Sequence, residues 1–156
     1  MTTPVRTAPA FCLVAVANVA VHLPSPTAEV VLREIEESKR QLTFPIGLAE
    51  GVALSHVLSG TRPPRPLTHE LFADVLRRYA VEIAAVRLVA RRGQTYFAEM
   101  ELTGRDGHHV VSCRPSDALT LALHQLVPAP VLVDDRLFQS TTDVPPWEPP
   151  SSEHGG

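Results

Sequence analysis

The sequence has few cysteines and no long uninterrupted hydrophobic run. Only two of its 156 residues are cysteine, and Cys12 and Cys113 lie outside any CxxC or Cys/His metal spacing. This pattern excludes a disulfide framework and a structural zinc site, and it favours a reducing, cytoplasmic location. The apolar stretch from Phe11 to Val21 is interrupted by Asn18 and is too short to cross a membrane, and its Val/Ala pattern favours a buried strand over a secretory signal. We therefore expect no membrane association.

An overall excess of positive charge is also missing. The formal net charge is -3, which argues against a general nucleic-acid coat protein. Positive charge is nevertheless concentrated between residues 60 and 92, a segment that contains seven arginines and only three acidic residues. This segment fits a phosphate-attracting face, and it fits equally well the solvated sides of a helix and a strand.

Hydrophobic residues make up 44% of the chain and charged residues 20%, which suits one domain with a real core. The patterns predict a single compact α+β domain over residues 1–138, with a mixed or antiparallel sheet of about six to seven strands and about three helices. The predicted strands are 11–23, 28–35, 42–46, 84–90, 96–102, 109–113 and 131–133, and the predicted helices are 49–58, 68–79 and 115–126. Residues 34–40 read as a charged, solvated turn. Residues 139–156 are rich in Pro, Ser and Gly and predict a disordered tail.

Capping signals set the predicted helix ends. Gly60 follows the first helix at the position favoured for a C-terminal stop, and Thr68 is the expected N-cap of the second. Glu70 would complement the dipole of that helix. The core-facing stripe of the second helix is predicted to be Leu71, Phe72, Val75, Leu76 and Tyr79.

Two arginine-bearing proline turns each precede a predicted helix. The first is Arg62-Pro63-Pro64-Arg65-Pro66, and the second is Arg114-Pro115 followed by Ser116 and Asp117. A proline holds the residue before it in an extended conformation, so Arg65 and Arg114 present their forked donors in a defined direction. Helix N-termini favour anions, and the two turns therefore indicate phosphate or metal chemistry.

Several segments together resemble the bifunctional nuclease family, which is also described as a domain of unknown function. They are Phe44-Pro-Ile-Gly47, Ala49-Glu50, Arg65-Pro-Leu-Thr-His-Glu-Leu71 and Arg114-Pro-Ser-Asp-Ala-Leu-Thr-Leu-Ala-Leu123. The resemblance runs from about Phe11 to Phe138. It implies an α+β domain that tends to dimerise and, in plant members, cleavage of RNA and DNA that depends on a divalent metal.

The chain departs from the family pattern at two positions. Ser112 stands where members commonly carry Asp, and Gly51 stands where they carry Ala. If the missing carboxylate helps to hold metal, this chain binds it weakly or not at all.

Phosphodiester cleavage requires charge stabilisation at phosphate, an activated water and usually one or two hard cations held by oxygen ligands. We predict that Glu50 and Asp117 hold Mg²⁺ or Ca²⁺ and that His69 positions or activates the water. The phosphate-binding residues are predicted to be Arg62, Arg65 and Arg114.

Each of these residues also has a structural interpretation. Glu50 and Asp117 are acids in first helical turns, where they ordinarily complement the dipole or accept backbone hydrogen bonds. His69 fits a surface histidine beside a cap. Arg65 and Arg114 fit ion pairs with Asp117, with Glu50 or with a partner subunit's carboxylate.

Three further polar residues are interpreted as structural. Glu99 and Glu101 share one strand face, which is the usual appearance of a solvated strand. Cys113 has no Cys/His partner for nucleophilic catalysis and reads as a small buried residue.

The leading functional prediction is a homodimeric, metal-dependent nuclease acting on DNA or RNA. The alternative is a non-catalytic dimeric interaction or regulatory module that binds a small anionic ligand or a partner protein. Carboxylates within mutual ligand reach would favour the enzyme, whereas Asp117 buried against Arg65 would favour scaffolding.

Overall fold

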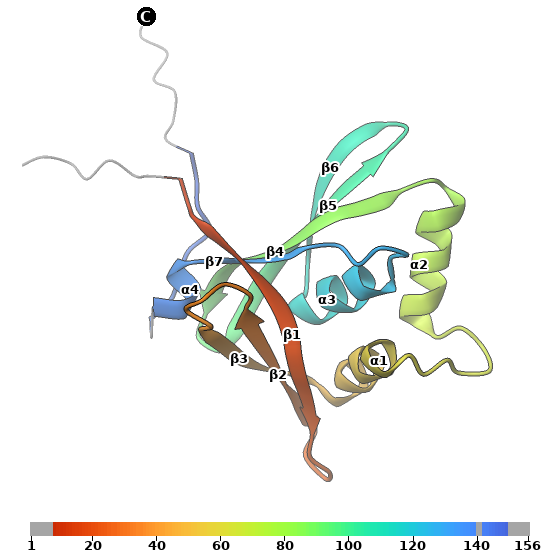
Figure 1. Ribbon diagram of the computed structural model, residues 1–156, viewed down its shortest axis with the longest axis horizontal. Coiled ribbons are helices and arrows are strands. Elements are labelled where there is room, and N and C mark those ends of the chain that lie inside the picture. The colour runs from red at the N-terminus through yellow and green to blue at the C-terminus, as the bar shows by residue number, and fades with distance from the viewer. Residues whose placement is uncertain (1–7, 140–141, 150–156) are drawn as a thin grey trace, which may run out of the picture.

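A seven-stranded mixed sheet runs through the protein (Figure 1), in a computed structural model that describes residues 8–139 and 142–149. The strands are β1 (Phe11–Val21), β2 (Thr27–Glu34), β3 (Gln41–Gly47), β4 (Glu82–Arg92), β5 (Thr95–Gly104), β6 (Gly107–Cys113) and β7 (Val131–Asp134). Their order in the sheet is β3-β2-β1-β7-β4-β5-β6. The short β7 joins two antiparallel three-stranded units, pairing antiparallel with β1 and parallel with β4. The predicted mixed sheet and the α+β class are confirmed, and the apolar N-terminal run is strand β1.

Four helices accompany the sheet within the described residues: α1 (Leu48–Ser59), α2 (Thr68–Arg78), α3 (Pro115–His124) and α4 (Arg136–Gln139). Helices α1 and α3 pack together and contact the strands, whereas α2 packs mainly on α3 at the outer end of this layer (Figure 1). The sequence predicts the first three helices but misses α4, because four residues are too few to show a helical period. No helix within the described ranges has the length and apolar content needed to span a membrane.

The ends of the helices confirm some capping predictions and correct others. Gly60 ends α1 with a left-handed backbone, at φ of +70°. The prediction of Thr68 as N-cap is wrong, since the cap is Leu67, whose N–H donates to Glu70 Oε2 at 2.5 Å. Helix α3 ends at His124 and not at residue 126 as predicted, because the backbone of Gln125 is extended. The Oε1 atom of Gln125 accepts the N–H of Ile83.

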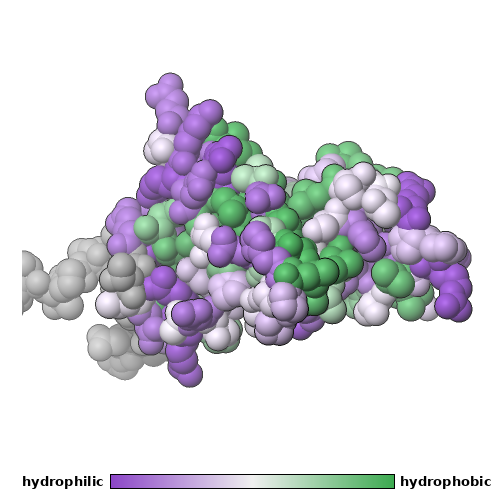
Figure 2. All heavy atoms as spheres, turned by 90° about the horizontal axis from the view of Figure 1, so that it is seen from below, coloured by the Kyte–Doolittle hydropathy of each residue, from purple (hydrophilic) through white to green (hydrophobic). Residues whose placement is uncertain are grey.

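The predicted core-facing stripe of α2 is mostly wrong. The apolar residues of its inner face are Ala73, which is buried, and Leu76, which packs against the core. The larger apolar side chains point outward and are between 43% and 75% exposed: Leu71, Phe72, Val75 and Tyr79. Apolar residues also gather over the half of the molecule that carries α1 and α2 in the view of Figure 2. Because α2 rests on another helix and not on the sheet, only a narrow strip of it is covered.

Gly51 explains how closely α1 approaches β2. A Cβ atom at this position would lie 2.4 Å from the Cβ of Ala28, closer than real Cβ contacts allow. The alanine common in the resembled family would therefore push α1 away from β2 here. Glycine at residue 51 permits the close contact of helix and strand.

The segment from Glu34 to Arg40 is a turn whose residues 35–39 are exposed, as the sequence predicts, but its two ends are not solvated. Glu34 is only 6% exposed, and its carboxylate accepts hydrogen bonds from the guanidinium of Arg40. Arg40 also donates to Asp135 Oδ1 at 2.7 Å and lies over the ring of Phe138, with 4.6 Å to its centroid. Hydrogen bonds from Arg40 and then from Ser38 lower the pKa of Glu34 to about 2. The segment therefore ties the end of β2 to the region of α4.

Part of the segment predicted as a tail is described by the structure. Val144 is buried and forms an antiparallel bridge with Arg91 of β4. The carboxylate of Asp143 accepts the N–H of Gly93 at 2.7 Å. Residues 140–141 and 150–156 lie outside the described residues, so disorder in the tail stays a prediction.

We expect Arg40→Ala to lower the melting temperature by more than about 5 °C near pH 7, because it leaves the carboxylate of Glu34 buried and unpaired. The folded-state pKa of Glu34 is lowered from 4.5 to about 2, so this stabilisation is complete above pH 4.5 and is lost as the pH falls towards 2. The difference between variant and wild type should shrink over that window. Thermal unfolding followed by circular dichroism at several pH values measures it. Arg105→Ala removes an exposed arginine as a control, and an equal loss in that variant would contradict the assignment.

Candidate functional site

Four of the predicted site residues meet in one cluster, which we call the Arg114 cluster: Glu50, His69, Arg114 and Asp117. Arg114 Nη1 donates to Glu50 Oε1 at 3.0 Å. Its Nε and Nη2 donate to Asp117 Oδ2 and Oδ1 at 2.8 and 3.0 Å. His69 Nε2 lies 2.9 Å from Asp117 Oδ1. One guanidinium therefore bridges two carboxylates, and the second carboxylate also holds an imidazole.

Three helix N-termini build the cluster. Glu50 is the third residue of α1, His69 is the second residue of α2, and Asp117 is the third residue of α3. Arg114 is the N-cap of α3, and the following Pro115 holds it extended, at φ of -73° and ψ of 147°, as predicted. The positive ends of α1 and α3 stabilise the carboxylates that they carry. The same ends would stabilise a bound anion.

Gly47 lets Glu50 reach its position. A Cβ atom on Gly47 would lie 2.1 Å from Glu50 Oε2, so the carboxylate folds back over this residue. The backbone at Gly47 has φ of -62°, which any residue can adopt. A larger residue at position 47 would therefore displace the flexible carboxylate of Glu50 and would not strain the backbone.

The ionisation of the cluster follows from its contacts. Partial burial raises the pKa of Asp117, but hydrogen bonds from Arg114 and His69 outweigh it, and the net pKa lies below its usual range. Hydrogen bonds to Asp117 and Glu50 raise the pKa of Arg114. Asp117 is therefore a carboxylate at neutral pH, paired with a permanent cation.

Arg114 and His69 differ in how much of each side chain is exposed to solvent. The side chain of Arg114 is 63% exposed, whereas that of His69 is 18% exposed. Asp117 accepts the Nε2 proton of His69, so Nδ1 carries the lone pair when the ring is neutral. The cluster thus presents a guanidinium to solvent beside an imidazole of fixed orientation.

Glu50 and Asp117 supply the hard oxygen donors that Mg²⁺ and Ca²⁺ prefer. Both oxygens of Asp117 and one of Glu50 already accept hydrogen bonds from Arg114. A divalent cation would therefore compete with the guanidinium for the same oxygens. Within residues 8–139 and 142–149, no group of three or more His, Cys, Asp or Glu side chains is placed to hold a metal ion.

The other two predicted phosphate-binding residues do not join the cluster. Arg65 is exposed on the loop before α2, and Asp117 pairs with Arg114 and His69. Arg62 is exposed and lines a separate cavity. The arginines between residues 60 and 92 also lie on different elements and have different partners. Arg77 pairs with Asp74 on α2, and Arg87 on β4 pairs with Glu101 on β5.

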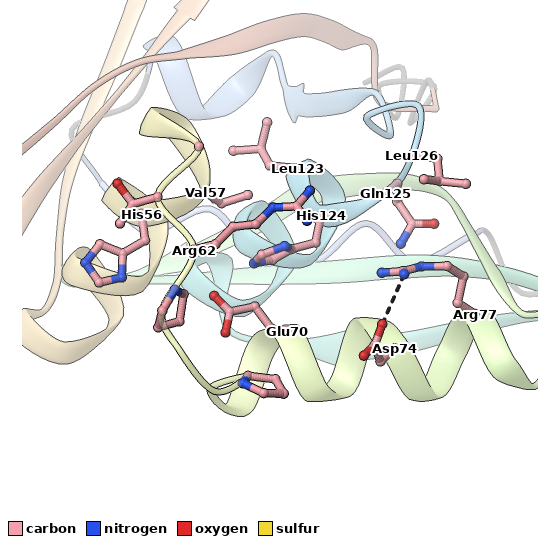
Figure 3. Close-up of a pocket in the computed structure, with 14 residues that line it drawn as sticks. His56, Val57, Arg62, Glu70, Asp74, Arg77, Leu123, His124, Gln125 and Leu126 are labelled. Carbon is pink, nitrogen blue, oxygen red and sulfur yellow. Dashed lines mark ion pairs between the residues drawn. The ribbon is translucent and has the colours of Figure 1, made fainter.

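The cavity lined by Arg62 has a volume of about 550 Å³. It lies between the end of α1, the loop of residues 60–66, the inner side of α2 and the end of α3 (Figure 3). The sequence predictions miss His56, His124 and Gln125 in its lining. The only sequence signal for the two histidines is their position in the last turns of α1 and α3, which also suits ordinary capping.

Three further residues flagged in the sequence lie outside the cluster. Ser112 is exposed on β6 and pairs with Glu99. The interpretation of Glu101 as merely solvated is wrong, because it binds both Arg87 and His108. Cys113 is half-buried, and burial is the main cause that raises its pKa to about 11, so its thiol stays protonated at neutral pH.

Comparisons with known proteins identify relatives of this chain. Residues 30–144 match the family described as the bifunctional nuclease domain, and this range contains all four residues of the Arg114 cluster. Two uncharacterized proteins from strains of Mycobacterium tuberculosis are each 33% identical over 125 residues, covering 80% of this chain and 73% of theirs.

A plant protein is also similar to this chain. Bifunctional nuclease 2 of Arabidopsis thaliana is 31% identical over 117 residues, which cover 70% of this chain and 35% of the plant protein. The match to the domain spans most of this chain, and the resemblance inferred from its motifs is confirmed. The chain belongs to the bifunctional nuclease domain family.

Proposed function

We propose that this protein is a nuclease that hydrolyses phosphodiester bonds of DNA or RNA at the Arg114 cluster. The observation that carries the proposal is the His69–Asp117 pair beside the exposed guanidinium of Arg114. Membership of the bifunctional nuclease domain family supports the choice of substrate class. The free thiols of Cys12 and Cys113 support action in the cytoplasm, where thiols stay reduced.

Each residue of the cluster has a role in this proposal. Arg114 uses three of its N–H groups on Glu50 and Asp117, and its other N–H groups are available to a phosphate oxygen. His69, oriented by Asp117, would accept a proton from water at Nδ1 as a general base. Glu50 holds the guanidinium from the opposite side. The arrangement follows the logic of a base oriented by a carboxylate.

We also propose that Glu50 and Asp117 hold Mg²⁺ or Ca²⁺ when the side chain of Arg114 leaves their oxygens and binds the phosphate alone. Such an ion would neutralise charge on the phosphate. The exposure of Arg114 supports this exchange, since its long side chain is covered on few sides.

A second candidate is a non-catalytic dimeric module, and one observation favours it. The outward apolar side chains of α2 form a surface that suits contact with another protein chain: Leu71, Phe72, Val75 and Tyr79. We propose that this surface is where the protein forms a homodimer. Dimerisation is compatible with either function, because the surface faces away from the Arg114 cluster, whose His69 lies on the inner side of the helix.

We expect His69→Gln to lower the rate of phosphodiester cleavage by about 100-fold or more, because it removes the general base. Glutamine keeps a polar side chain at this position. Cleavage of single- and double-stranded DNA and RNA by rigorously purified protein, with Mg²⁺, Mn²⁺, Ca²⁺ or EDTA, measures the effect. His109→Gln, at an exposed position on β6, is the matched control. Equal cleavage by wild type and a Glu50→Ala/Asp117→Ala double variant would place the activity elsewhere or in a contaminant.

We expect Gly47→Ala to lower the cleavage rate by roughly 3-fold to 10-fold, because the new Cβ displaces the carboxylate of Glu50 and weakens its bond to Arg114. The melting temperature should change little, since alanine can adopt this backbone conformation. Steady-state kinetics would separate kcat from KM. In a Glu50→Ala background the Gly47 substitution should have no further effect. An additive loss in the double variant would show that Gly47 acts through something other than Glu50.

We expect Phe72→Glu to convert a dimer to a monomer, because it places a charge within the outward apolar surface of α2. Size-exclusion chromatography with light scattering over a range of protein concentrations measures the mass. Leu23→Glu, at an apolar position that is 76% exposed in the β1–β2 turn, is the control. A wild-type protein that stays monomeric at high concentration would rule out this homodimer.

A further inference from the structure

The cavity near Arg62 is separate from the Arg114 cluster and shares no residue with it. Its volume of about 550 Å³ lies within the range of small-molecule sites, roughly 300–1,000 Å³. One side of its lining is apolar and comes from Val57, Leu123 and Leu126. The cavity is therefore large enough for a ligand with a flat apolar face, and not only for an ion.

Asp74 and Arg77 of the cavity lining already pair with each other, with 3.0 Å between Oδ1 and Nη1. The carboxylate of Glu70 accepts the neutral N–H of Leu67 and keeps its negative charge. Among the described residues, Arg62 has no ion-pair partner. Figure 3 shows its guanidinium and the ring of His124 directed into the space between α1 and α2. The guanidinium of Arg62 can therefore bind a single anionic group of a ligand.

The opposite part of the lining offers neutral hydrogen-bonding groups. Gln125 Oε1 accepts the N–H of Ile83, so the amide NH₂ of Gln125 remains as a donor. Burial is the main cause that lowers the pKa of His124, and the charges of His69 and Arg77 add to it against the opposite effect of Glu70. The ring is therefore neutral near pH 7, with one donor and one acceptor nitrogen. The buried Nδ1 of His56 also has no hydrogen-bond partner within the described residues.

We propose that this cavity binds one nucleotide unit of a nucleic-acid strand, with the phosphate on Arg62 and the base against Leu123 and His124. A nucleotide combines the required features, namely one anion, a flat apolar face and an edge with both donors and acceptors. The two remaining acids, Glu70 and Asp74, disfavour additional negative charge. A single phosphate therefore fits better than a triphosphate.

The inference rests on the proposed nuclease function and extends it to how the strand is held. Adjacent residues at the start of α2 serve the two sites, since His69 belongs to the Arg114 cluster and Glu70 lines the cavity. A strand held at one nucleotide in the cavity would pass the first turn of α2. The cavity would thus orient the strand, and the Arg114 cluster would carry out the cleavage.

Titration calorimetry and amide NMR of the full chain test the proposal with four probes: adenosine monophosphate, adenosine, adenosine triphosphate and the dinucleotide ApA. The monophosphate should bind about tenfold more tightly than adenosine, because a charge-assisted hydrogen bond is lost without the phosphate. It should also bind at least as tightly as the triphosphate. ApA should bind at least as tightly as the monophosphate, and the amides of Leu123 and His124 should shift.

Three variants locate the two ends of the ligand. Arg62→Ala should weaken monophosphate binding about tenfold and leave adenosine unaffected. Gln125→Glu keeps the acceptor for Ile83 but removes the amide donor, and it should weaken adenosine as well. Arg78→Ala removes an equal charge from the exposed side of α2 and should change neither affinity.

The outcomes separate this inference from the proposed function. Cleavage of nucleic acid without any probe binding at the cavity would overturn the inference and leave the nuclease intact. Binding through Arg62 without any cleavage would overturn the nuclease and keep a nucleotide site. If the monophosphate binds and ApA does not, the proposal that the cavity holds a nucleic-acid strand is wrong, and the cavity binds a free nucleotide instead.

Discussion

The guanidinium of Arg114 is the contact on which the arrangement of the helices depends. It joins the first turn of α1, through Glu50, to the first turn of α3, through Asp117. The same Asp117 binds His69 and so fixes the start of α2, which has few contacts with the sheet. Three positive helix ends would repel one another if they met without compensation. The two carboxylates supply that compensation, and Arg114 balances the carboxylates in turn.

Two sites of different character result from this arrangement. The Arg114 cluster is charged and presents its cation to solvent, whereas the cavity beside Arg62 is partly apolar and has neutral hydrogen-bonding groups. The first turn of α2 contributes to both, because side chains of neighbouring helical residues point in different directions. The two proline turns that stand out in the sequence therefore serve different sites, since Arg62 lines the cavity and Arg114 anchors the cluster.

The sequence predicts the architecture well because its signals are local. Strand alternation, the stop at Gly60 and the proline that opens α3 depend on neighbouring residues only, and so does the extended Arg114. The partners of Arg114 depend on contacts between distant parts of the chain, with 64 residues separating it from Glu50. The apolar stripe of α2 is misjudged for the same reason, since periodicity shows that a stripe exists but not which neighbour covers it. The cavity has no motif at all, because four separate segments line it.

The mode of attachment of α2 has a consequence for the energetics of the protein. A helix that packs on one other helix can open locally at a lower free energy than the sheet requires to unfold. Because α2 supplies His69 to one site and Glu70 to the other, its opening would dismantle both sites while the sheet stays intact. A rise in temperature that opens α2 would therefore remove both sites before the sheet unfolds.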